Sequence, residues 1–487
     1  MQKNNLNYAT PESLGIPSGA VESFLEVLKE KNLCMHSFVL IRHGKVAAEG
    51  YWPPFDEHRK QRMYSISKSF TSVAIGMMIG EGKLSLDSKA ADFFPEYLPE
   101  KPHRYVLEAT VRDLLMMATF NVSTSSSDTD FTEAFFMDQR PKHKPGQVFS
   151  YDTSATNVLC AIVEKLAEKP LLEYMRPVLD EIGFSEDAWC VQTPEGRSWT
   201  GSGIICTTRD LARFAMLCMN LGQWDGKQLI NREYMQAATS RQIDNSVTTD
   251  WADACFGYGY QFWCMKDGGF AMYGMGSQFA LCMPKYDTIL ITTADTQGLT
   301  DALEIIFDTY ANLLKTFSPE TLPEDKFAYI KLEERIAGLS IPLPKGKTRT
   351  PLAEKIFDRK YTLEENQAGI KWLRLLAESD KYRLQYENNS GKHELLFGIG
   401  KYEPQLFPEK YFGRRIGVKD TNYQCIGAAA WADDKTLLCT LYSVDVYMGS
   451  IKIQLTFEDD EVCGCMVKAA EWFFDEYQGF ISGKAGV

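Results

Sequence analysis

The sequence predicts an α+β fold, in which an antiparallel sheet is flanked by helices and carries an inserted helical subdomain, followed by a small antiparallel β domain. Two β-hairpin patterns, one near each end of the first 316 residues, predict the sheet. The residues between the hairpins have mostly helical periodicity, which predicts the insertion. Beyond residue 352 apolar residues alternate with polar ones, as in half-buried strands.

The N-terminal elements are a helix and a hairpin. Ser18 is placed to cap a helix, and that helix has an apolar face made of Val21, Phe24, Leu25 and Leu28. Residues 37–42 then form an apolar extended run, His43-Gly44 predicts a turn, and residues 45–51 form the second strand of a hairpin. The chain therefore begins with a helix that can pack on a two-stranded ribbon.

The second hairpin repeats this arrangement in the reverse order. Residues 279–283 and 288–293 are the strands, a turn joins them at 284–287, and an amphipathic helix follows up to about Leu314. Between the two hairpins three segments have helical periodicity: residues 111–117, 157–166 and 210–221. A sheet built from both ends of this region, with a helical body inserted, accounts for the pattern.

Residues 317–351 differ in composition from what precedes and follows them. This stretch holds five prolines and many charges, and prolines at this density break regular elements. We therefore expect a linker, interrupted by one short helix around residues 331–337. The predicted domains are therefore 1–316, a proline-rich linker at 317–351, and a β-rich domain at 352–487. The alternation at residues 451–457 is the clearest strand of the last domain, which can be a barrel or a sandwich.

The composition excludes several classes of partner and cofactor. The 487 residues carry a formal net charge of −13 and no basic block, which argues against nucleic acid and anionic membranes. The first ten residues lack the apolar core of a signal peptide, so a cytoplasmic location is expected. The 12 scattered cysteines fit reduced buried thiols, and no histidines stand at metal-ligand spacing, so neither a metal nor another cofactor is expected.

Ser65 and Lys68 form a Ser-x-x-Lys motif just before a strongly apolar helical pattern. Their spacing places both side chains on one face of a helix, at its first turn. A serine hydroxyl becomes a nucleophile when a neighbouring base takes its proton, and a partly neutral lysine can act as that base. By itself the motif also fits a capping serine beside a solvated lysine.

Several segments in order resemble the serine β-lactamase and penicillin-recognising family, and most closely its class C β-lactamase and esterase-like branch. The segments are residues 36–45, Tyr64-Ser-Ile-Ser-Lys68, 80–87, 111–117, Pro145-Gly-Gln-Val-Phe-Ser-Tyr151, 201–214, 257–263 and 274–278. The resemblance spans roughly residues 10 to 315. It implies a β-lactamase-like fold for this region.

The resemblance also implies roles for individual residues. Ser65 matches the acylated nucleophile, Lys68 the lysine that shares its proton, and Tyr151 the tyrosine of a Tyr-x-Asn motif, which serves as a phenolate or proton relay. Here that motif is Tyr151-Asp152-Thr153, so Thr153 stands where the family has an amide.

The third family motif, Lys-Thr-Gly, aligns with Met272-Tyr273-Gly274, so its lysine is absent while its glycine is kept. Gly274 and Tyr273 are expected to line the substrate site. The Met275 N–H is expected to be the second oxyanion donor beside that of Ser65.

These residues lead to two hypotheses. The first is a serine hydrolase that cleaves an ester or amide of a small molecule or peptide-like substrate through an acyl-enzyme on Ser65. The two altered motifs favour an esterase or amidase over an efficient β-lactamase. The alternative is a binding or scaffold protein that keeps the fold with weak or no catalysis. The oligomeric state stays open.

Overall fold

The structure is a computed structural model and describes residues 6–121, 127, 129–138, 140–249, 254–409, 423–471 and 473–486. The chain divides into two compact units. The first comprises Met1–Thr296 and Asp301–Ser340, and the second comprises Gln297–Thr300 and Ile341–Val487. Among the described residues, none of the helices combines enough length with enough apolarity to cross a membrane.

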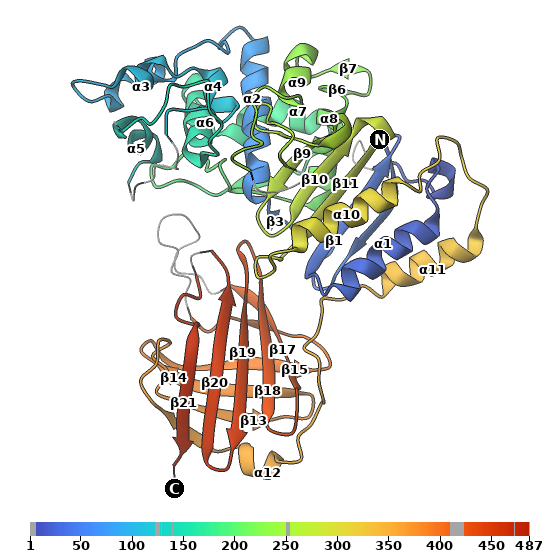
Figure 1. Cartoon of the computed structure of the whole chain (residues 1–487), viewed down its shortest axis with the longest axis vertical. Coiled ribbons are helices and arrows are strands. Elements are labelled where there is room, and N and C mark those ends of the chain that lie inside the picture. Colours follow the sequence, from blue (N-terminus) through green and yellow to red (C-terminus); the bar gives the residue numbers. More distant parts are fainter. Residues whose placement is uncertain are drawn as a thin grey trace. The chain divides into compact units, whose positions relative to one another are not determined.

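The first unit is organised around a six-stranded antiparallel sheet in the order β2-β1-β11-β10-β9-β8. The strands β1, β11, β10 and β9 are labelled in Figure 1. Its strands are β1 (Met35–Arg42), β2 (Lys45–Tyr51), β8 (Trp263–Cys264), β9 (Phe270–Gly274), β10 (Gln278–Met283) and β11 (Thr288–Ala294). Both predicted hairpins are present, and β1 pairs with β11, with Val39 opposite Ile291. The sheet is therefore assembled from the two ends of this region, as the sequence predicts.

Helices cover both faces of this sheet. Alternate residues of a strand point to opposite faces, so neighbouring residues contact different helices. Phe38 of β1 and Phe279 of β10 both lie opposite Thr292, so they share a face. On that face Phe38 contacts Phe24 of α1 (Ser18–Glu30), and Phe279 contacts Phe307 of α10 (Ala302–Leu314). Figure 1 shows α1 and α10 lying along the sheet.

The opposite face of the sheet is reached by residues next in sequence to these. Ser37, beside Phe38, hydrogen-bonds to Thr208 of α8 (Thr208–Met219), with 2.7 Å between the hydroxyl oxygens. Every residue of β1 is buried, which follows from helices lying on both sides.

The predicted cap of α1 is wrong. The N-cap residue is Pro17, and Ser18 is the first helical residue. The Ser18 N–H and hydroxyl donate to the two carboxylate oxygens of Glu12, at 2.8 and 2.9 Å. A buried carboxylate from the preceding turn thus satisfies the first N–H of the helix, in place of a side chain at the cap itself.

The inserted helical part lies between β2 and β8. Its helices are α2 (Ser67–Gly80), α3 (Arg104–Glu108), α4 (Val111–Leu115), α5 (Phe131–Met137), α6 (Thr153–Ala167), α7 (Leu171–Glu181), α8, already described, and α9 (Arg232–Ala238). Its strands are β3 (Gln61–Arg62), β4 (Trp189–Cys190), β5 (Ile204–Cys206), β6 (Gln223–Trp224) and β7 (Lys227–Gln228). The helix α2 is buried on nearly all sides, and its Phe70 stacks on Phe214 with ring centroids 3.7 Å apart. A helix enclosed in this way holds its side chains in fixed positions.

The segment predicted as a linker contains a longer helix than expected, α11 (Lys326–Ala337). It packs against α1, and the Arg335 guanidinium pairs with Glu22 at 3.1 Å. The helix α1 lies about 300 residues earlier in the sequence. A composition rich in proline and charged residues does not indicate this contact.

The second unit is a ten-stranded sheet that closes on itself. Its strands are β12 (Lys360–Leu363), β13 (Trp372–Ala377), β14 (Lys381–Asn388), β15 (Gly391–Ile399), β16 (Glu403–Leu406), β17 (Gln424–Trp431), β18 (Thr436–Val444), β19 (Met448–Glu458), β20 (Glu461–Ala469) and β21 (Gly479–Ala485), with the short helix α12 (Ala353–Ile356) before them. Neighbouring strands are antiparallel, and a short parallel pairing of β15 with β17 completes the closure. The predicted alternation in β19 is confirmed, since Ile451, Ile453, Leu455 and Phe457 are buried.

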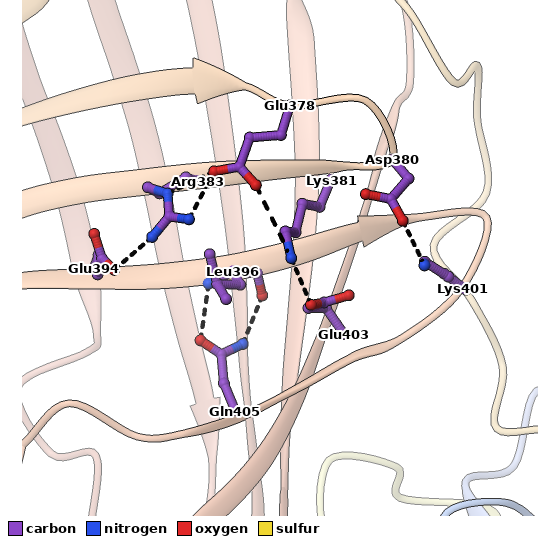
Figure 2. A network of polar contacts seen from close by, with 9 residues as sticks. All are labelled: Glu378, Asp380, Lys381, Arg383, Glu394, Leu396, Lys401, Glu403 and Gln405. Carbon is purple, nitrogen blue, oxygen red and sulfur yellow. Dashed lines mark hydrogen bonds and ion pairs between the residues drawn. The ribbon is translucent and has the colours of Figure 1, made fainter.

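The outer side of β14, β15 and β16 carries a polar network (Figure 2). Lys381 lies between Glu378 and Glu403, with its Nζ 2.8 Å from the Glu403 carboxylate. Arg383 bridges Glu378 and Glu394 in the same way. Charges of both signs along this part of the sheet favour the observed order of strands.

Candidate active site

Ser65 and Lys68 lie close together where α2 begins. Ser65 belongs to the 3₁₀ helix η2 (Tyr64–Ile66), and Lys68 lies in the first turn of α2. Lys68 Nζ is 2.9 Å from Ser65 Oγ. The lysine is only 1% exposed, so it is not the solvated surface lysine of the competing interpretation. A lysine this deeply buried normally has dedicated partners.

Two further groups surround the Lys68 amine. Its Nζ donates to the carbonyl oxygen of Gly201 at 2.5 Å. The ring of Tyr151 lies beside it, with 5.0 Å from Nζ to the ring centroid. The amine is therefore directed at Ser65 Oγ by a backbone carbonyl and an aromatic ring, and it is shielded from water.

Tyr151 ends the loop before α6 and hydrogen-bonds to Ser65. Burial raises the pKa of the Tyr151 phenol far above its ordinary value, and the hydrogen bond to Ser65 lowers it by less. Tyr151 is therefore a neutral phenol near pH 7. It can donate a proton or pass one on, but it is not a resting phenolate.

The next two residues start α6. Asp152 is its N-cap and accepts a hydrogen bond from the Ser154 N–H at 2.9 Å. Burial raises the pKa of the Asp152 carboxyl to about 6, although its hydrogen bonds with Ser154 oppose that shift. Thr153 packs directly on Gly201, because a Cβ added to that glycine would collide with the Thr153 methyl group.

The end of β9 lies against the same turn as Ser65. A Cβ at Gly274 would collide with the carbonyl oxygen of Met63, two residues before Ser65, so only glycine permits this approach. Met275 follows in the turn to β10 and is 39% exposed. The predicted third-motif region therefore lies beside Ser65, although Met272 stands where the family motif has its lysine.

An aromatic stack joins the second and third motif regions. Trp263 stacks on Tyr151, with ring centroids 5.3 Å apart, and on Tyr273, with centroids 5.6 Å apart. The sequence alone predicts core packing for Trp263 and no individual role for Gly201. Both residues lie within the family-like segments 257–263 and 201–214, but that resemblance does not indicate what they contact.

The geometry as a whole offers a serine hydroxyl, an amine at hydrogen-bonding distance, a neutral phenol and backbone N–H groups at a helix start. These are the components of nucleophilic acyl transfer. Ser65, Lys68, Tyr151, Thr153 and Gly274 come from three separate segments of the chain, and the fold brings them to one place.

Comparison with known proteins agrees with this architecture. In sequence, the chain is 22% identical to a 6-aminohexanoate-dimer hydrolase from Paenarthrobacter ureafaciens over 310 residues, which cover 58% of this chain and 79% of the relative.

Two solved structures share the fold. The first is provisionally identified as a 6-aminohexanoate-dimer hydrolase from Bacillus anthracis, with 20% identity, a TM-score of 0.54 and coverage of 66% of this chain and 90% of that one. The second is provisionally identified as a β-lactamase from Bacteroides dorei, with 14% identity, a TM-score of 0.50 and coverage of 61% and 98%.

A family model gives the most direct assignment. The model described as beta-lactamase matches residues 33–310, which include the six-stranded sheet, the helical insertion and every residue of the candidate site. This protein belongs to the β-lactamase family.

Proposed function

We propose that this protein is a serine hydrolase that cleaves an ester or amide of a small molecule or peptide-like substrate through an acyl-enzyme on Ser65. The observation that carries the proposal is the buried Lys68 amine, 2.9 Å from Ser65 Oγ. A structural lysine on a helix would direct its charge to water, whereas this one is enclosed against a hydroxyl group.

The contacts support a sequence of proton transfers. Lys68 Nζ donates to the Gly201 carbonyl and to Ser65 Oγ, and once the amine is deprotonated it can accept the hydroxyl proton across the same 2.9 Å contact. Lys68 takes the hydroxyl proton as Ser65 attacks the substrate carbonyl. Tyr151, a neutral phenol bonded to Ser65, gives its proton to the leaving group and is reprotonated by the Lys68 ammonium, so the serine proton is accounted for. Water then hydrolyses the acyl-enzyme and restores the Ser65 hydroxyl.

The developing oxyanion needs hydrogen-bond donors that are already in place. The Ser65 N–H lies at the start of a helix, and we assign the Met275 N–H as the second donor. Each such donor typically contributes about 3–4 kcal/mol to transition-state stabilisation. The close packing of Gly274 on the Met63 carbonyl supports this role, because it holds the turn against the strand that precedes Ser65.

The substrate class follows from what the site lacks and what the relatives act on. The position of the family lysine is Met272, so a substrate carboxylate has no matching charge there. Thr153 replaces the amide of the second motif. Together with the similarity to 6-aminohexanoate-dimer hydrolases, these replacements favour simple esters and linear amides over β-lactams.

Covalent labelling with a fluorophosphonate probe tests the nucleophile. The wild type and Ser69→Ala should be labelled stoichiometrically, while Ser65→Ala should not be labelled. Ser69 is the matched control, since it is a buried serine of α2, the helix that follows Ser65, and its hydroxyl donates to the Gln261 carbonyl. Full labelling of Ser65→Ala would disprove the assignment.

Turnover of p-nitrophenyl acetate and p-nitrophenyl butyrate tests the base. Lys68→Ala should lower kcat by about 10²- to 10⁴-fold, the usual contribution of a positioned acid or base. Equal rates for wild type, Ser65→Ala and Lys68→Ala would favour the binding-protein alternative.

A substrate screen then identifies the substrate class. Turnover of N-acyl amides, D-amino amides, 6-aminohexanoate dimer and nitrocefin is measured for the wild type and compared with turnover by Ser65→Ala.

A further inference from the structure

We propose that Arg62 is a positioning residue of this hydrolase, which holds the Gly201 carbonyl on Lys68 and the backbone that leads into Ser65. This inference rests on the proposed function. Arg62 contacts the sequence neighbours of two residues of the site. It acts through Ser202, the neighbour of Gly201, and through Tyr64, the neighbour of Ser65.

The Arg62 side chain is completely buried and has well-defined contacts. Its Nε donates to the Ser202 carbonyl at 2.8 Å, and its Nη2 donates to the Ser202 hydroxyl at 2.7 Å. The guanidinium carbon also lies over two aromatic rings, 4.2 Å from the Tyr64 centroid and 4.6 Å from the Trp199 centroid. A planar guanidinium that packs on two rings has a fixed orientation, which sets the direction of its hydrogen bonds.

The contact with Ser202 determines where the Gly201 carbonyl points. Arg62 itself is held by strand pairing, with β3 beside β5 and Arg62 opposite Ile205. From this position Arg62 hydrogen-bonds to Ser202, the residue that follows Gly201. The Gly201 carbonyl accepts the Lys68 N–H at 2.5 Å, so its orientation decides which way the amine faces. Displacement of the 201–202 turn therefore turns Lys68 away from Ser65.

The contact with Tyr64 supports the other side of the site. Tyr64 has a φ of 48°, in the left-handed region that non-glycine residues rarely adopt. Such a conformation persists only when the surroundings hold it, and it is common next to functional groups. The Tyr64 ring is 1% exposed and lies under the guanidinium, so Arg62 stabilises the turn that presents Ser65.

Arg62→Lys is the decisive variant, because it keeps the charge and loses the planar fork. With p-nitrophenyl acetate we expect kcat to fall by about 10- to 100-fold, as for a catalytic group displaced by about 1 Å, while KM changes less than about twofold. Assays are run well below the melting temperature of every variant.

Arg42→Lys is the matched control. Arg42 is also a buried arginine of the first unit, and its Nη1 donates to the carbonyls of Leu14 and Gly15 at 2.8 and 3.1 Å. It also lies over an aromatic ring, that of Phe317, at 4.7 Å. We expect Arg42→Lys to lower the melting temperature and to leave kcat within about twofold of wild type, since it holds no segment of the proposed site.

The outcomes separate the two proposals. Wild-type kcat in Arg62→Lys, or an equal loss of kcat in Arg42→Lys, would overturn the role of Arg62. If Arg62→Lys does not fold, Ser202→Ala decides instead: it removes one of the two hydrogen bonds and should lower kcat by about 3- to 10-fold at unchanged KM. A wild-type enzyme without Ser65-dependent turnover would refute the proposed function itself, which is a different result from wild-type activity in Arg62→Lys.

Discussion

Gln278 is a buried side chain that holds the turn carrying the Met275 N–H, the proposed second oxyanion donor. It is fully buried, and its Nε2 donates to the carbonyls of Met275 and Ala294 at 2.9 and 2.6 Å. Its Oε1 accepts the Ala294 N–H at 3.1 Å. The turn that carries Met275 is therefore tied to the end of β11 by a side chain that can make all three bonds at once.

Gln278→Leu should lower kcat about tenfold or more, because a loosened turn loses part of what an oxyanion donor contributes. The measurement is kcat and KM with p-nitrophenyl acetate at a temperature where the variant is folded. Gln405→Leu, which removes a similar amide in the second unit, should leave kcat unchanged. A variant that melts earlier but retains full kcat would show that Gln278 only stabilises the fold.

His36 makes stability depend on pH. Burial lowers the pKa of His36 from 6.5 to about 3, with a nearby Arg59 acting in the same direction and the hydrogen bond to Gln61 opposing it. Between pH 3 and 6.5 the unfolded chain binds a proton that the folded chain does not. The contribution of His36 to stability is therefore complete above pH 6.5 and is lost as the pH falls.

At pH 5 this loss corresponds to about 2 kcal/mol. His36→Gln cannot titrate, so its melting temperature should decline less steeply than that of wild type between pH 7.5 and 5. Thermal melts of both proteins across this range provide the comparison. Parallel curves would mean that other groups govern the acid sensitivity.

At the scale of elements, the closure of the second unit depends on a side chain as well as on strands. The parallel contact of β15 with β17 spans only Gly398–Ile399 opposite Ala428–Ala429. Earlier in β15, the backbone N–H and carbonyl of Leu396 are satisfied by Gln405 of β16, at 2.8 and 2.6 Å, as Figure 2 shows. The amide of Gln405 thus takes the place of a neighbouring strand at this point.

Gln405→Leu should lower the free energy of unfolding of the second unit by about 1–3 kcal/mol, because it leaves two backbone groups of Leu396 without their partner. Urea unfolding of the full chain, followed by tryptophan fluorescence, measures the change. An unchanged midpoint would show that water satisfies Leu396 equally well.

At the scale of the whole molecule, each unit has its own hydrophobic core. One core surrounds Phe70 of α2, and the other surrounds Trp431 of β17. Units with separate cores usually unfold in separate steps. We therefore expect two calorimetric transitions for the full chain.

Trp431→Ala should lower one transition and Phe70→Ala the other, since each removes about 3–5 kcal/mol of core packing from its own unit. Esterase activity should disappear with the transition that Phe70→Ala shifts. A single transition that both variants lower would contradict independent unfolding.

Much of the fold could be predicted because its signals are local. The hairpins at residues 37–51 and 279–293 and the alternating strand at 451–457 are specified by side-chain period and turn residues, which neighbouring residues determine. The proximity of Ser65 and Lys68 follows equally from helical spacing. Ser18 shows the limit even here, because a carboxylate outside the helix replaced the expected cap.

What the tertiary structure decided is where distant segments meet. The sequence by itself determined the two hairpins of the first region, the presence of a β-rich region at the end of the chain and the Ser-x-x-Lys spacing of Ser65 and Lys68. It did not reveal that Gly201 directs the Lys68 amine, that Arg62 holds Ser202, or that β15 reaches β17. Those contacts join residues that lie 30, 133 and 140 positions apart in the sequence. They depend on strand register and on burial between distant segments, which a local sequence pattern does not specify.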